Sequence, residues 1–420
     1  MPKRRRIAWF STWFKDGYSR SLSAYFSSRL IPLLNERYEI EFFSADFSGP
    51  SDIPCFHYLK AFEEHRSRPY DLFIYNLENS KSAYFARTHL ALIPGVVVFH
   101  DLLFGDFGPE PILNSAWRHT VKKFHSSAEP FPDRAQEHRQ SGPQGYREAA
   151  FAPAAVFMNE RSHEQYIREV EFGLLGRSER LSYYLSYPIE PFDVCAGDLQ
   201  AIDRFRVGII GPPRIENRTH KALLALQKLG EASELHWMVG SEEERKLASD
   251  LHSEYRLGEV RFYTNGSPEV WREIAANIDC AMHLRFSVFG QVEPYLGISL
   301  MAGRAVLVTD FGDSCYLPDS LMFKIVPGEI EAGQIAEVLR TIRTGAVPPA
   351  DKISAYASER YDPGMVAEEF SSILEQSFST MSSIMQNWQA LEVQARQEVL
   401  NEQAAHSGPF KDQFRELGLL

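Results

Sequence analysis

The sequence is poor in the features that identify several common classes of protein. It has 4 cysteines among 420 residues and no Cys-x-x-Cys pair, so it indicates neither a zinc site nor a disulfide framework. No aspartate cluster of the metal-binding kind is present. No apolar run is long enough to span a membrane, and the N-terminus lacks the apolar core of a signal peptide. We therefore expect a cytoplasmic protein without a metal site.

The chain also lacks a broadly basic composition. Its 44 Lys and Arg residues stand against 56 Asp and Glu, which gives a formal net charge of -12. Binding to a phosphate backbone needs a broad basic surface, so the charge argues against a nucleic-acid partner. The run Lys3-Arg4-Arg5-Arg6 is an exception that would suit peripheral contact with anionic lipid. We favour the alternative, a solvated start to the first strand.

The remaining features are those of an ordinary globular α/β protein. Its 420 residues exceed one core of usual size and fit two domains with an extension. Apolar strands alternate with helices in both halves, which predicts two doubly wound, Rossmann-like domains facing one another across a cleft. We place the first domain at residues 1–195, the second at 196–361 and a helical extension at 362–420.

The most informative stretch is residues 279–313. It predicts, in order, an apolar strand, a polar loop, a helix that ends before Gly303, and a second strand. A unit of this kind places the loop and the helix N-terminus at the carboxyl edge of a parallel sheet, where backbone N–H groups favour an anion such as a diphosphate. The polar candidates are Arg285 at the end of the strand and Gln291 and Glu293 in the loop.

The strand that opens the second domain ends at Gly211, and a second polar loop follows it. Three basic residues, Arg214, Arg218 and Lys221, lie in this loop or in the first turn of the next helix. A diphosphate needs cations or helix N-termini to be bound, although basic residues before a surface helix are common. We expect Arg218→Ala to weaken nucleotide binding more than folding, because an exposed loop cation has little packing role.

The first domain has a polar pair at the end of a central strand. The apolar run Val96–Phe99 is followed by His100 and Asp101, and ligands bind at this end of the strands in open α/β sheets. A histidine can hydrogen-bond hydroxyl groups in either tautomer. The alternative is a histidine that only completes the end of the strand.

Several segments resemble those of retaining glycosyltransferases with two facing Rossmann-like domains, the GT-B fold, in the family 4-like group that includes sucrose synthase and bacterial mannosyltransferases. The matching residues are Pro94-Gly95-Val96-Val97-Val98 with His100-Asp101, His283-Leu284-Arg285, Gly290-Gln291, Ala302-Gly303-Arg304, and Thr309-Asp310-Phe311-Gly312 running to Leu317-Pro318. The resemblance implies a hexosyltransferase-type enzyme, as in polysaccharide biosynthesis. It would move a sugar from a nucleotide-diphosphate sugar to a glycan, lipid-linked or protein acceptor with retention of configuration, without a cofactor or metal.

The resemblance also implies roles for the candidate residues. His100 would contact the donor sugar, with Asp101 beside it. The diphosphate would be held after Gly211 by Arg214, Arg218 and Lys221, with Arg285, and the sugar or ribose by Gln291 and Glu293. The loop with Asp16, Gly17 and Tyr18 would shape the acceptor side of the cleft. A late helix, after Asp362, would cross back to the first domain, and the donor diphosphate would accept the proton of the acceptor.

Four positions depart from the pattern of that family. Pro212 and Asn217 stand where an arginine and a lysine are usual, and Gly290 and Ile298 stand where two glutamates are usual. These departures keep open a second function, a catalytically degenerate subunit that acts as a binding or scaffold partner.

A third function, a sugar-nucleotide epimerase of the same shape, would need carboxylates in the cleft. Glu78, Asp101 and Glu293 could supply them, although the flanking motifs fit poorly. The nucleotide, the sugar, the acceptor and the oligomeric state stay open.

Overall fold

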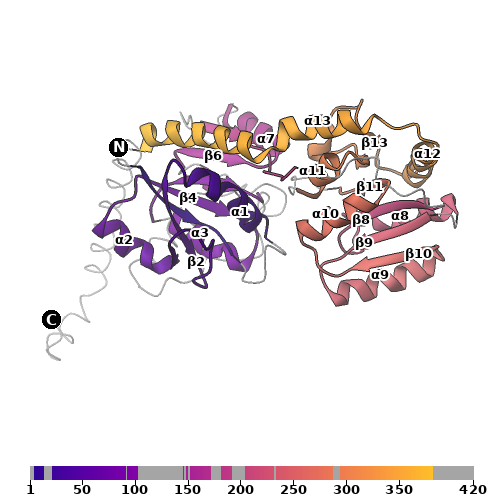
Figure 1. Cartoon of the computed structure of the whole chain (residues 1–420), viewed down its shortest axis with the longest axis horizontal. Helices are drawn as coiled ribbons and strands as arrows, with labels where there is room; N and C mark the ends of the chain where they lie inside the picture. The colour runs from indigo at the N-terminus through magenta and orange to yellow at the C-terminus, as the bar shows by residue number, and fades with distance from the viewer. Residues whose placement is uncertain are drawn as a thin grey trace, which may run out of the picture.

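The computed structural model describes residues 4–13, 21–90, 92–102, 145, 148–149, 152–171, 181–191, 204–230, 233–286 and 294–381. These residues form two α/β domains, each built on one parallel sheet (Figure 1). A helix after the second domain returns to the first. The predicted fold class is therefore confirmed. The candidates Asp16, Gly17, Tyr18, Gln291 and Glu293 lie outside the described residues, as does Gly290.

The first domain has a seven-stranded sheet with the strand order β3-β2-β1-β4-β5-β6-β7, in which every pair is parallel. The central strands are buried along their whole length, as expected for a parallel sheet with helices on both faces. The strands are β1 Arg6–Phe10, β2 Glu39–Ser44, β3 Cys55–His57, β4 Leu72–Leu77, β5 Val96–Phe99, β6 Ala154–Phe157 and β7 Leu181–Tyr184. The helices are α1 Leu22–Leu34, η1 Tyr58–Lys60, α2 Ala61–Ser67, η2 Lys81–Ala83, α3 Tyr84–Leu90 and α7 Glu160–Glu171.

The second domain has a six-stranded parallel sheet with the order β10-β9-β8-β11-β12-β13. The strands are β8 Phe205–Ile210, β9 Ser233–Met238, β10 Glu259–Tyr263, β11 Cys280–His283, β12 Ala305–Thr309 and β13 Phe323–Ile325. The helices are α8 Thr219–Leu229, α9 Glu242–Tyr255, α10 Pro268–Asn277, α11 Pro294–Met301, η3 Gly312–Tyr316, α12 Glu331–Arg343 and α13 Ala350–Tyr361. The strand, helix and strand predicted within residues 279–313 are thus confirmed as β11, α11 and β12, whereas most of the predicted loop lies outside the described residues.

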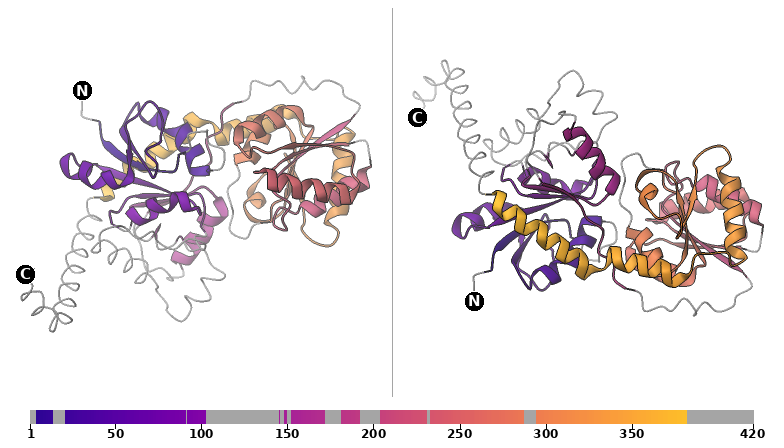
Figure 2. Two further views of the ribbon diagram at one scale, coloured as in Figure 1. Left: turned by 90° about the horizontal axis from the view of Figure 1, so that it is seen from below. Right: turned by 90° about the horizontal axis from the view of Figure 1, so that it is seen from above.

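The helix over residues 363–381 lies along the first domain (Figure 2). Its Phe370 is 0% exposed and packs edge-on against Trp9 and Phe26, with ring centroids 5.9 and 5.8 Å away. The chain therefore passes between the domains twice. The two passages are hydrogen-bonded to each other, since the Ile189 amide donates to the Tyr361 carbonyl at 2.7 Å.

Direct contacts also join the two domains. The Asp313 carboxylate, in η3, accepts a hydrogen bond of 2.9 Å from the Glu160 amide at the start of α7. On α1, Arg29 forms ion pairs of 3.0 Å with Glu190 and 3.2 Å with Glu269 of α10. These contacts fix how the carboxyl ends of the two sheets face one another.

The basic run at the N-terminus is only partly a solvated segment. Arg6 is 2% exposed, pairs with Glu41 at 2.6 Å, and lies over the Tyr70 ring. For Arg6, both the solvated start and the lipid contact that we considered are wrong, because its charge is buried against a partner. Arg5 pairs with Glu375 of the returning helix at 3.3 Å and stays half-exposed.

Candidate functional site

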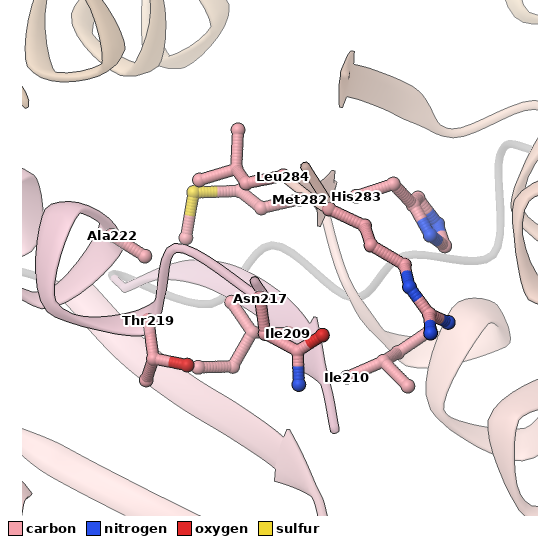
Figure 3. A pocket seen from close by; sticks show the side chains of 9 residues that line it. Ile209, Ile210, Asn217, Thr219, Ala222, Met282, His283 and Leu284 are labelled. Atoms are coloured by element: carbon pink, nitrogen blue, oxygen red, sulfur yellow. The ribbon is translucent and has the colours of Figure 1, made fainter. Parts of the chain in front are cut away.

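A pocket opens at the carboxyl ends of β8 and β11, beside the start of α8 (Figure 3). Its empty space, including its opening to solvent, is about 370 Å³. It is lined by Ile209, Ile210, Asn217, Thr219, Ala222, Met282, His283, Leu284 and Arg285. This is the edge at which open α/β sheets bind ligands, and the lining offers an amide, a hydroxyl, an imidazole and a guanidinium group.

The loop between β8 and α8 is held by its own contacts. Gly211 has a left-handed φ of 92°, and a Cβ there would lie 2.7 Å from the Asn217 side chain, so only glycine fits without strain. The Asn217 amide donates to the Pro212 carbonyl at 2.9 Å. Asn217, which stands where the resembled family has a lysine, therefore holds the loop in shape and brings no charge to the pocket.

Arg218 is not an exposed loop cation. Its side chain is 15% exposed, and its guanidinium bonds both carboxylate oxygens of Glu331, with Nε and Oε1 at 2.9 Å. The Glu331 side chain is 0% exposed and also accepts from the Gly328 amide at 3.3 Å. The expectation that Arg218 has little packing role is wrong, because its removal would leave a buried carboxylate unpaired. Its contact with a diphosphate stays a prediction.

The other two basic candidates of this loop are more accessible. The Arg214 side chain is 60% exposed and has only long ion pairs, 3.8 Å to Glu216 and 3.9 Å to Glu244. Lys221 donates to the Gly328 carbonyl at 3.3 Å. Exposed pairs of this length contribute little to stability, so neither charge is tightly neutralised. Both residues lie next to the pocket in sequence, and their contact with a ligand stays a prediction.

Arg285 and Asp101, one from each domain, interact electrostatically. Arg285 follows β11 and lines the pocket, whereas Asp101 follows β5 of the first domain. The Asp101 carboxylate accepts a hydrogen bond of 2.9 Å from the Asn79 amide. Burial raises the pKa of Asp101, and the Asn79 bond and the charge of Arg285 oppose this rise. Two of the predicted residues, one from each domain, are thus close enough to interact.

His100 lies at the predicted strand end but faces inward. Its ring is 0% exposed, with Nε2 at 3.0 Å from Asn76 Oδ1 and Nδ1 at 2.5 Å from the Tyr187 hydroxyl. Because an amide oxygen only accepts, Nε2 carries the proton and Tyr187 donates to Nδ1. Burial lowers the pKa of His100 to about 3, so the ring is neutral. These contacts are those of a histidine that completes the strand end, and its contact with a sugar stays a prediction.

Ile298 occupies a position where the resembled family has a glutamate. It is 2% exposed, on α11 in the core that joins the domains. The neighbouring Gly297 is just as tightly packed, since a Cβ there would lie 2.2 Å from the Ile189 side chain of the interdomain passage. This part of α11 is therefore built for packing, and residue 298 offers no polar group to a ribose.

Glu78 is a polar residue of the site that sequence reasoning weighed only for the epimerase alternative. It directly follows β4, next to β5 and Asp101. Its Oε2 accepts hydrogen bonds from Ser21 Oγ at 2.7 Å and Ser23 Oγ at 2.8 Å. Burial raises the pKa of Glu78 to about 7; the serine hydrogen bonds lower it and the Asp101 charge raises it further. The signal in the sequence was its place at the end of an apolar strand.

Two absences hold for the described part of the chain. There, no group of three or more His, Cys, Asp or Glu side chains is placed to hold a metal ion. Among those same residues, every helix is too short or too polar to cross a membrane.

No protein-family model matches the chain, and no curated protein matches it. Solved structures do. It is similar to Anabaena Alr3699/HepE in complex with UDP and glucose (16% identity, 89% of this chain, 100% of that chain, TM-score 0.60). It is also similar to sucrose-phosphate synthase from Thermosynechococcus elongatus (14% identity, 90% of this chain, 100% of that chain, TM-score 0.61). A third similar structure is WaaG, a glycosyltransferase involved in lipopolysaccharide biosynthesis (16% identity, 87% of this chain, 99% of that chain, TM-score 0.56). The chain therefore has the two-domain GT-B fold.

Proposed function

We propose that the chain is a glycosyltransferase that moves a sugar from a nucleotide-diphosphate sugar to an acceptor hydroxyl with retention of configuration. A fold alone does not define a reaction, so the proposal depends on the site. The observation that carries it is the pocket at the ends of β8 and β11, with Arg285 in its lining and Asp101 of the other domain near that charge. The similar solved structures add support, because Alr3699/HepE is also described in complex with UDP-glucose.

In this proposal the nucleotide binds to the second domain. Arg285 lies beside the diphosphate, with Lys221 and Arg214 as further cations, because the charge of Arg218 is already balanced by Glu331. A cation fixed at this place stabilises the charge that develops on the leaving nucleotide. Asp101, held by the Asn79 amide, faces the sugar and orients a hydroxyl group. No cofactor and no metal are needed.

The chemical step moves the sugar from the diphosphate oxygen to the acceptor oxygen. The bond between the anomeric carbon and the diphosphate oxygen breaks, and a bond between that carbon and the acceptor oxygen forms on the same face of the sugar. The acceptor proton passes to the released diphosphate, so no protein base is required. His100, neutral and fixed by Asn76 and Tyr187, keeps the end of β5 in place beside the sugar.

Calorimetric titration of the whole chain with UDP, GDP and dTDP and with their glucose and mannose conjugates tests this function. We expect one nucleotide series to bind, and NMR of the product to show a transferred or released sugar with the donor's anomeric configuration. Failure of every nucleotide to bind contradicts the proposal and favours a scaffold role. An epimerised nucleotide sugar would instead identify an epimerase. A product with the opposite anomeric configuration to the donor would contradict the proposed retention of configuration.

A matched pair of variants locates the site. Arg285→Ala should weaken nucleotide binding at least tenfold, because it removes the cation in the pocket lining. Arg343→Ala, the same change at the exposed end of α12, should leave the Kd within twofold. Equal affinities of these two variants would place the diphosphate elsewhere.

A further inference from the structure

Glu78 is a carboxylate to which the proposed reaction assigns no role. It lies at the carboxyl edge of the first sheet, where β4 ends beside β5. It also lines a cavity of about 230 Å³, including its opening, with Leu77, Asn79, Ser80, Ala83, Tyr84 and Arg87. Glu78 therefore borders a small cavity of the first domain.

The hydrogen bonds of Glu78 are all on one side. Oε2 accepts from Ser21 Oγ, from Ser23 Oγ and, at 3.4 Å, from the Ser23 amide. Ser21 is the N-cap of α1, so this oxygen lies at a helix N-terminus. Within the described part of the chain Oε1 has no hydrogen bond, and it is not among the atoms shut off from solvent. One oxygen thus fixes the side chain, and the other is available.

Two titratable groups interact with Glu78, and each of them also interacts with a residue of the second domain. Asp101 follows β5, Tyr187 follows β7, and both interact electrostatically with Glu78. Arg285, from the second domain, interacts with Asp101, and Tyr295 of α11 interacts with Tyr187. The neighbours of Glu78 thus interact with residues of the second domain. Two carboxyl groups on this side disfavour an anionic acceptor group.

We propose that Glu78 Oε1 accepts a hydrogen bond from the acceptor hydroxyl and holds that hydroxyl in the cleft, beside Asp101 and opposite Arg285. This inference rests on the proposed function, because it assigns the acceptor side of the same reaction. It specifies a neutral, hydroxyl-bearing acceptor such as a sugar. The acceptor proton still goes to the diphosphate, and Glu78 sets the position and direction of the hydroxyl oxygen.

The test uses water as the acceptor, since water held by Glu78 would slowly release free sugar from the bound nucleotide sugar. We expect Glu78→Gln to leave the nucleotide Kd within twofold and to reduce this release at least tenfold. The rate of sugar release by the wild type should rise with pH around the pKa of Glu78, about 7. The rate of the variant should not show this rise. Glu369→Gln, the same change on the exposed side of the last described helix, is the control.

The outcomes separate the two proposals. If the wild type binds no nucleotide, the proposed function fails. If it binds a nucleotide sugar but releases no sugar, or if Glu78→Gln releases it at the wild-type rate with the same pH profile, the role of Glu78 fails while nucleotide binding stands. Glu78→Asp, which keeps the carboxylate, should recover part of the rate in the positive case. Thermal unfolding of each variant shows that it is folded.

Discussion

The guanidinium of Arg218 and the carboxylate of Glu331 form a two-point ion pair that joins the start of α8 to the start of α12. The two residues are 113 positions apart in the sequence. The pair is almost closed to water, since the Arg218 side chain is 15% exposed and the Glu331 side chain 0%. A buried pair of this kind is costly to break from one side, because the remaining charge has lost its partner. Arg218 therefore has a structural task besides any contact with a ligand.

We expect Arg218→Ala to lower the free energy of unfolding by about 3 kcal/mol, because it leaves the buried Glu331 unpaired. Chemical denaturation measures this loss. Lys221→Ala, which removes a neighbouring cation with one long hydrogen bond, should cost less than about 1 kcal/mol. The double replacement Arg218→Met with Glu331→Leu should recover most of the stability. Equal losses for the two single variants would contradict the importance of the pair.

We expect His100→Ala to reduce both stability and sugar transfer. The variant leaves the Tyr187 hydroxyl and the Asn76 amide oxygen without a partner in the core, which costs about 3 kcal/mol together with the lost packing. Transfer should fall because Asp101 is the next residue. The nucleotide Kd should not change, since the pocket lies in the other domain. Turnover equal to the wild type, per folded molecule, would remove His100 and its strand end from the reaction.

The sequence predicts the elements of the fold well where local signals agree. Helix α10 has clear sequence signals, because Ser267 caps it, Pro268 takes its first position, and its apolar residues have helical spacing. Helix α9 is harder to predict. It buries only Ala248, so it lacks the apolar stripe, although Ser241 and the three glutamates after it are a start signal. Strand β3 has no such signal, because three half-buried residues give no pattern.

The candidate site was predictable only as a set of strand ends. His100, Asp101, Gly211 and Arg285 all lie at the carboxyl edges where the strand pattern places them. Whether each side chain faces the cleft depends on partners that the local sequence does not reveal. Tyr187, 87 residues away, keeps the His100 ring in the core, and the Glu331 partner of Arg218 is just as remote. Contacts of this range come from the topology of the sheets.

We expect Glu78→Gln to change the pH dependence of stability. The pKa of Glu78 is raised from 4.5 to about 7 in the folded chain, so between these values the folded state binds a proton that the unfolded state has lost. Wild-type stability therefore falls as pH rises through this window, by about 2 kcal/mol for a partly exposed side chain. Glu78→Gln lacks this loss, so its free energy of unfolding relative to the wild type should rise between pH 4.5 and 8. Glu369→Gln should show a smaller rise.

We expect Asp313→Ala to weaken the coupling between the domains. The Asp313 carboxylate accepts from the Glu160 and Arg161 amides at 2.9 and 3.4 Å, so a residue of the second domain caps a helix of the first. Loss of a cap costs about 1 kcal/mol. Because this loss falls on a contact between two folding units, calorimetry should show a broader transition that begins at a lower temperature. Asp319→Ala, at an exposed residue of the same domain, is the control, and identical transitions for the two variants would show that the domains are held together elsewhere.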